Sequence, residues 1–192
     1  RDLRMSRGLG DVYKRQDPAY VGLAKEIHKA QEALMDGKDP VTVKPELAEI
    51  MDEIHVQFPQ AANDNIGFGS TIFAVKPGDG SAREQAASCQ KVLGGWANIA
   101  NEYATKRYRS NLINWGMLPF VIPDGDLPFT NHDYLFFPGI RKAVEEKAAE
   151  ITGYVVDANG LKPFTVTLGE LTDEERQIIL KGCLINYNRV EK

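Results

Sequence analysis

The sequence is poor in the residues that build disulfide scaffolds and metal sites. Its 192 residues include two cysteines, Cys89 and Cys183, far apart and without a CxxC pair or a histidine at ligand spacing. This excludes a disulfide-stapled scaffold and a self-contained metal site, and we expect both thiols to be buried. Apolar runs stay well short of the ~20 residues that a membrane-spanning helix needs. An ordinary globular chain without repeats or low-complexity tracts remains.

Residues 1–16, RDLRMSRGLGDVYKRQ, show no hydrophobic period. They resemble translated sequencing adapter, because a transposon-end tag reads SRGLGDVYKRQ and its upstream primer supplies Arg1 and Asp2. A variable index between the two leaves room for residues 3–5. We treat the segment as non-native and expect the natural sequence to begin near Asp17, inside a longer gene, as in a metagenomic fragment.

The charge of the chain is acidic, and more so without that segment. Residues 1–16 contain five of the 23 basic and two of the 27 acidic residues, so the net charge changes from −4 to −7. Such a charge opposes non-specific binding to nucleic acid or to an anionic membrane surface. The other 176 residues suffice for one hydrophobic core. We expect a cytoplasmic protein.

Periodicity predicts an α/β fold with an N-terminal helical extension. Helices over about 18–35 and 45–57 form an extension or linker, residues 17–60. Residues 71–122 then read strand, helix, strand, helix, strand, and the first strand, TIFAV, is apolar enough to be buried on both faces. A strand and short helix over 132–146, a hairpin turning at Asp157–Gly160 and a capping-box helix from Thr172 follow.

The turn PGDGSAREQAA, residues 77–87, is the first candidate site. A glycine turn from a strand into a helix directs free N–H groups and the positive end of the helix dipole at one point, which suits an anion. Arg83 lies in the first turn, where the dipole disfavours a cation unless a carboxylate or phosphate binds beside it. The alternative is that Ser81 only caps the helix, while Arg83 pairs with a nearby carboxylate or faces solvent.

A spaced set of motifs extends this turn. GDGSAREQAASCQKVLGG followed by SNLINWGMLPF resembles the C-terminal swivel domain of the aconitase superfamily. That family carries Gly-Ser-Ser-Arg-Glu-His-Ala-Ala, then Leu-Gly-Gly, then Asn-Leu, Gly and Leu-Pro. The resemblance is strongest over residues 80–120, and FFPGIRKAV and GCLINYNR look like a bacterial aconitase-like hydratase branch. It implies a swivel-type β/β/α domain over residues 61–192.

The resemblance also implies an activity. Members are [4Fe–4S] hydro-lyases that dehydrate and rehydrate hydroxy-polycarboxylic acids of the citrate and aconitate type. The cluster would be held by preceding domains of the same chain, or by a large subunit, so that this chain alone is inactive and binds no metal itself. Ser81 matches the serine that takes the proton from carbon, and Arg83 the carboxylate-binding arginine. The substrate-binding positions implied are Gly80, Ala82, Arg83 and Asn111.

Two departures from the family pattern leave the substrate open. Ala82 replaces a second serine and Gln85 replaces a histidine, which removes a hydroxyl donor and a titratable ring. Two other functions remain as alternatives: the small subunit of an isopropylmalate-type dehydratase, and a non-catalytic module that binds an anion or RNA. The acidic charge argues against RNA.

Other conspicuous residues favour structural roles. Lys106, Arg107 and Arg109 lie on one predicted helix and fit a solvated basic face better than an approach path for an anionic substrate. His132 is expected at the surface of a loop. Trp96 and Trp115 are expected to pack.

Overall fold

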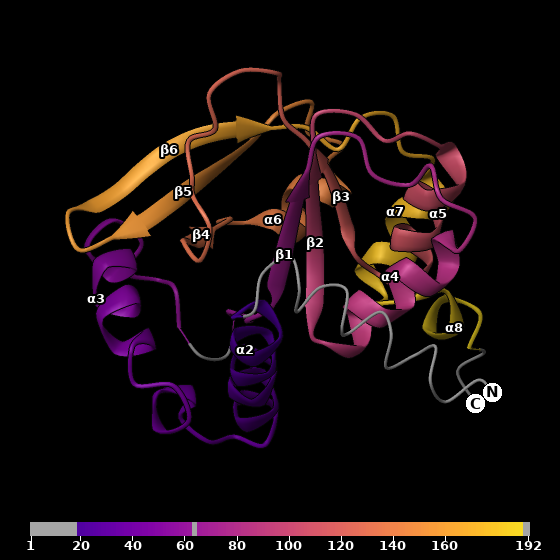
Figure 1. The fold of residues 1–192 in the computed structure, drawn as a ribbon. Coiled ribbons are helices and arrows are strands. Elements are labelled where there is room, and N and C mark those ends of the chain that lie inside the picture. Colours follow the sequence, from indigo (N-terminus) through magenta and orange to yellow (C-terminus); the bar gives the residue numbers. More distant parts are fainter. Residues whose placement is uncertain (1–18, 63–64, 190–192) are drawn as a thin grey trace.

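The structure is a computed structural model that describes residues 19–62 and 65–189 (Figure 1). The N-terminal segment contains α2 (Tyr20–Met35), the short helix η1 (Pro40–Thr42) and α3 (Leu47–Gln57). The middle of the chain contains β1 (Ser70–Ala74), α4 (Arg83–Val92), β2 (Gly95–Ala100), α5 (Lys106–Asn114) and β3 (Leu118–Val121). The remainder contains β4 (Tyr134–Phe136), α6 (Ile140–Glu145), β5 (Ile151–Asp157), β6 (Gly160–Val166), α7 (Asp173–Leu180) and α8 (Leu184–Tyr187). The predicted mixed α/β fold is confirmed.

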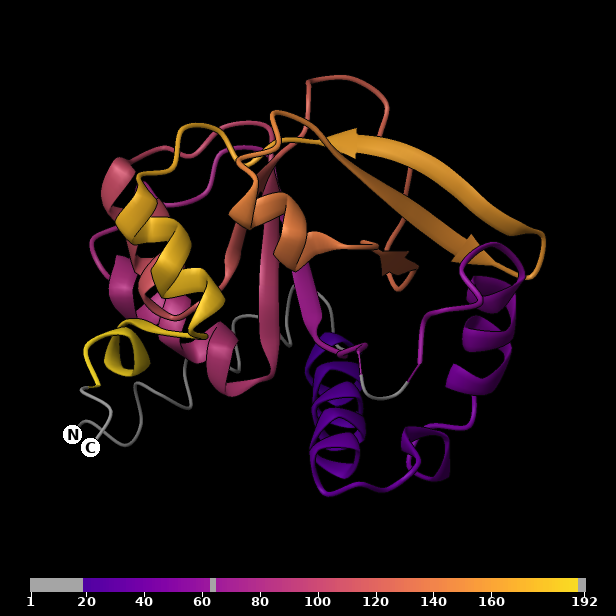
Figure 2. The ribbon, with the colours of Figure 1, turned by 180° about the vertical axis from the view of Figure 1, so that it is seen from behind.

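Two three-stranded sheets and a pair of helices form three layers. The parallel sheet has the order β1-β2-β3, and the antiparallel sheet has the order β4-β5-β6. One face of the parallel sheet, with Ile99 and Phe120, packs against α6 and the antiparallel sheet. The other face is covered by α4 and α5, where Tyr108 and Leu112 are buried (Figures 1 and 2). Both faces of the central strand β2 are therefore covered, which explains its nearly continuous burial.

The first strand corrects one expectation from the sequence. TIFAV was expected to be buried on both faces, but every residue of β1 is half-buried. The reason is its place at an edge of the parallel sheet, where β2 is its only strand partner among the described residues. Two short helices, η1 and α8, were not predicted, because three or four residues are too few to show a helical period.

The N-terminal helical segment packs onto the rest of the domain. Figures 1 and 2 show α2 beside β1 and α3 beside the far end of the β5–β6 hairpin. Leu47, Met51 and Ile54 give α3 an apolar stripe, which joins a second core with Val156 of β5. Phe58 adds edge-to-face contacts with Phe136 and Tyr154, at centroid distances of 5.3 and 5.4 Å. The division into a linker, residues 17–60, and a domain, residues 61–192, remains a prediction.

Two helices, α2 and α5, each end in a glycine turn of the same type. Gly37 after α2 and Gly116 after α5 have φ values of 72° and 69°, which favour glycine. In each turn the next residue donates its backbone N–H to the carbonyl oxygen five positions back, Lys38 to Ala33 and Met117 to Leu112. The sequence has a glycine directly after the helix expected before the third strand of residues 71–122, and the structure confirms that Gly116 ends this helix, α5.

Candidate functional site

The serine of the β1–α4 turn does not cap the helix. The residue before α4 is Ala82, which makes no side-chain cap hydrogen bond. Ser81 is exposed, and its hydroxyl makes no hydrogen bond with the described residues. The first-turn N–H groups of Arg83, Glu84 and Gln85 also have no partner there. An uncommitted hydroxyl beside free N–H donors is an arrangement that can receive an oxyanion.

Arg83 is held by the turn itself. Its Nε donates to the carbonyl oxygen of Gly78 at 3.0 Å, and one terminal nitrogen donates to the carbonyl oxygen of Asp79 at 3.4 Å. Neither acceptor is a carboxylate, and Arg83 forms no ion pair within the described part of the chain. The alternative for Arg83, a carboxylate partner or a side chain facing solvent, is therefore not found: among the described residues no carboxylate pairs with it, and the side chain is half-buried. A half-buried guanidinium with fixed orientation keeps its charge available to an anion.

Thr105 anchors the same turn and was not singled out from the sequence. Its hydroxyl donates to the carbonyl oxygen of Gly78 at 2.9 Å and accepts the N–H of Tyr108 at 3.2 Å, which caps α5. Gly78 has φ +98°, and a Cβ there would lie 2.5 Å from Cβ of Tyr108. The turn is thus fastened to the start of α5. A threonine before a helix is a recognisable cap signal, but its bond to Gly78 depends on tertiary structure.

The predicted site residues separate into two groups. Gly80, Ser81 and Ala82 are consecutive and exposed, and Arg83 follows them at the helix start. Asn111 lies in α5 and lines a neighbouring pocket of about 230 Å³ instead. The other lining residues are Glu84, Asn114, Trp115, Cys183, Leu184 and Ile185. Glu84 lies in the first turn of α4 and lines the same pocket as Asn111, so it connects the two groups. The role of Asn111 in substrate binding remains a prediction.

The basic residues of α5 do not act as one group. Lys106 and Arg107 are exposed next to Thr105, so they lie near the turn. Arg109 points to the segment after β6, where it donates to the carbonyl oxygens of Leu168 and Glu170 at 2.9 and 2.7 Å. The solvated face predicted for all three thus holds for the first two.

Both tryptophans make packing contacts. Trp115 is half-buried and donates its indole N–H to Glu84 at 3.1 Å. Trp96 is 41% exposed. Its ring nevertheless lies on the backbone of Gly67 and Gly69, since a Cβ at either glycine would overlap it. His132 is exposed in its loop, as expected.

The cysteines differ from the expectation. Both are free and only half-buried, because Cys89 lies on the flank of α4 and Cys183 borders the pocket. Burial and the charge of Glu84 raise the pKa of Cys89. Within residues 19–62 and 65–189, no three His, Cys, Asp or Glu side chains group as a metal site would require. No helix in the same ranges is long and apolar enough to cross a membrane.

The capping geometry gives a first prediction. We expect Ser81→Ala to change the free energy of unfolding by less than about 0.5 kcal/mol, because the side chain makes no contact that folding needs. Thr172→Ala is the matched control, since Thr172 and Glu175 form a complete capping box at α7. Its loss should cost about 1–2 kcal/mol. Urea denaturation measures both, and an equal loss for Ser81→Ala would restore the capping role.

Comparisons with known proteins bear on this turn. Residues 60–125 match the aconitase C-terminal domain family, and this range contains the turn, α4, α5 and the parallel sheet. The match supports a relationship to the aconitase superfamily. No curated protein matches the chain significantly. A structural match is 3-isopropylmalate dehydratase from Methanocaldococcus jannaschii, at 23% identity and a TM-score of 0.37, covering 72% of this chain and 75% of that one.

Proposed function

We propose that this chain is the substrate-closing domain of a hydro-lyase that dehydrates and rehydrates a hydroxy-polycarboxylic acid of the citrate and aconitate type. The observation that carries the proposal is the free Ser81 hydroxyl at the start of α4, beside Arg83. The family match over residues 60–125 supports the hydro-lyase class. Ser81 is the proposed base for the carbon-bound proton, and Arg83 the proposed carboxylate ligand.

The surroundings of Ser81 suit that role. A serine hydroxyl is a very weak base, so the alkoxide form needs compensating positive charge and hydrogen-bond donors. The free N–H groups of the ten-residue helix α4 and the fixed guanidinium of Arg83 supply both. Exposed Lys106 and Arg107 at the start of α5 add positive charge near the turn. Asp79 and Glu84 of the same turn are exposed carboxylates, so the three cations exceed them by one positive charge. This excess favours an anionic substrate, despite the acidic net charge of the chain.

The cysteines of this chain do not fit the [4Fe–4S] cluster of the proposed enzyme. An iron–sulfur cluster takes several cysteine thiolates, whereas this chain has two cysteines, and Cys89 carries a raised pKa. We therefore propose that the [4Fe–4S] cluster is bound by preceding domains or by a large subunit. Either partner would bring the cluster to the exposed turn of residues 80–83. A cytoplasmic location is part of the same proposal.

Ala82 and Gln85 bear on the choice of substrate. Ala82 follows Ser81 and Gln85 lies in the first turn of α4, and neither provides the hydroxyl or imidazole of the family pattern. The lack of these two groups leaves the identity of the hydroxy-polycarboxylic acid open. A tricarboxylate remains the first substrate to test, and other hydroxy-polycarboxylic acids follow.

A titration with citrate tests the proposal on the chain itself. We expect binding with a Kd of about 1 mM or weaker, because only half of the site is present. Amide chemical-shift changes should centre on residues 80–85, and Arg83→Lys should reduce them because lysine lacks the bidentate fork. Arg107→Lys is the control and should leave them unchanged. Shifts confined to residues 106–109 would contradict the proposed site.

A further inference from the structure

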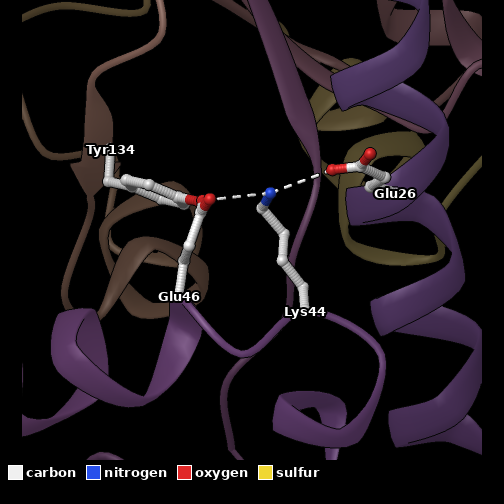
Figure 3. Close-up of polar contacts among 4 residues, drawn as sticks. All are labelled: Glu26, Lys44, Glu46 and Tyr134. Carbon is white, nitrogen blue, oxygen red and sulfur yellow. Dashed lines mark hydrogen bonds and ion pairs between the residues drawn. The ribbon is translucent and has the colours of Figure 1, made fainter.

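A buried lysine joins three elements of the fold. Lys44, between η1 and α3, is 5% exposed, and its amine contacts Glu26 of α2 at 3.0 Å and Glu46 at 3.1 Å (Figure 3). Glu46 precedes α3 and accepts a hydrogen bond from the Tyr134 hydroxyl of β4 at 3.1 Å. One cation thereby connects the two helices of the N-terminal segment with the antiparallel sheet.

The charged groups around Lys44 are paired: its amine contacts the carboxylates of Glu26 and Glu46. Burial by itself lowers the pKa of Lys44, but the hydrogen bonds with Glu26 and Glu46 outweigh it and raise the pKa overall. The bonds from Lys44 and Tyr134 lower the pKa of Glu46. Lys44 and Glu46 are therefore both charged at neutral pH. Moving α2 or α3 away from Lys44 therefore breaks ion pairs of a lysine that is buried in this arrangement, although both carboxylates are more than half exposed.

The two ends of the segment are also held separately. On the side of the parallel sheet, Gln31 of α2 accepts the N–H of Phe68 at 2.7 Å, and Gly94 approaches His28 so closely that a Cβ would lie 2.9 Å from the His28 Cβ. On the other side, Phe58 after α3 packs on Phe136 and Tyr154. Lys44 contacts Glu26 of α2 and Glu46 before α3, so it joins the two helices that make these contacts (Figure 3).

We propose that the cluster of Glu26, Lys44, Glu46 and Tyr134 is a latch that fixes α2 and α3 to each other and to the antiparallel sheet. Because α2 also contacts the side of the parallel sheet, the helical segment and both sheets then move as one rigid body. The segment is then part of the moving domain, not a linker to it. That this domain moves rests on the proposed function, whereas the latch itself does not.

Two measurements on the full chain test the latch. In the unsubstituted protein, ¹⁵N relaxation should give α2, α3 and β2 the same rotational correlation time. Lys44→Met keeps the side-chain size and removes the charge, and it should speed hydrogen exchange in α2 and α3 by roughly 10- to 100-fold, with β2 unchanged. Lys38→Met is the control, since the Lys38–Asp36 pair is exposed at 3.5 Å, and it should alter exchange less than about twofold.

Distinct outcomes would overturn the latch. Separate tumbling of residues 20–57 in the unsubstituted chain would do so without any variant. Unchanged exchange in Lys44→Met, or equal acceleration in β2 and α2, would do so as well. If Lys44→Met does not fold, Glu26→Gln gives the same comparison with one weakened bond. No readout involves a substrate, so failure of the proposed enzyme leaves the result on the latch intact.

Discussion

Replacing Ser81 by alanine should lower kcat by roughly 10²–10⁴-fold in the proposed hydro-lyase, with little change in KM. The reason is that the Ser81 hydroxyl is exposed, makes no bond with described residues and lies at the start of α4 beside Arg83. Removing a proton acceptor that acts only during the reaction changes the transition state more than substrate binding. Steady-state kinetics with the purified, fully assembled enzyme measure the effect.

Arg83→Lys is the companion variant. Lysine keeps the charge but loses the fork that holds Gly78 and Asp79 and that could grip a carboxylate. We expect a raised KM together with a lowered kcat, since both carboxylate binding and alkoxide stabilisation weaken. If Ser81→Ala turns over at a near-normal rate while melting at a lower temperature, the base assignment is wrong.

The largest stability effect is expected for Gly116→Ala. A Cβ at Gly116 would overlap the carbonyl oxygen of Gly182, and φ is +69°. Both contacting groups are backbone, so neither can move aside without separating α5 from the α7–α8 connection. We expect a loss of about 3–5 kcal/mol in the free energy of unfolding. Urea denaturation followed by circular dichroism measures it.

Gly37→Ala is the matched control, because it tests the cost of a positive φ without the steric overlap that Gly116→Ala creates. Gly37 occupies the same helix-ending turn at φ +72°, but a Cβ there would meet no atom within 4 Å. Its loss should be limited to about 1–2 kcal/mol, the cost of a left-handed alanine. Equal losses for the two variants would show that Gly182 moves away without cost.

Local sequence signals predicted most of the fold. The apolar stripes of α2 and α3, the glycine after α5, the hairpin turn at Asp157–Gly160 and the capping box at Thr172 each act within a few residues of chain. The position of each strand within its sheet could not be predicted. The half-buried edge position of β1 depends on which strands become its neighbours, and an apolar run cannot encode this.

The same division applies to the candidate site. Ser81 and Arg83 are two residues apart, so the turn motif alone places them together. The anchoring of that turn joins Gly78 to Thr105, 27 residues later, through a backbone carbonyl that carries no sequence signal. Lys44 looks like an ordinary surface lysine until Glu26 and Tyr134 are brought to it by tertiary packing. Asn111 was grouped with Ser81 by family spacing, but it lines the pocket beyond Glu84.

The most direct test of the account is solvent deuterium incorporation at the carbon from which the substrate loses its proton. It is measured by NMR in the assembled enzyme with citrate in ²H₂O. If Ser81 is the base, the unsubstituted enzyme incorporates deuterium and Ser81→Ala does so at least about 100-fold more slowly. Thr172→Ala, which alters only a helix cap, should exchange at the normal rate for the folded protein. Undiminished incorporation in Ser81→Ala would contradict the role of this serine.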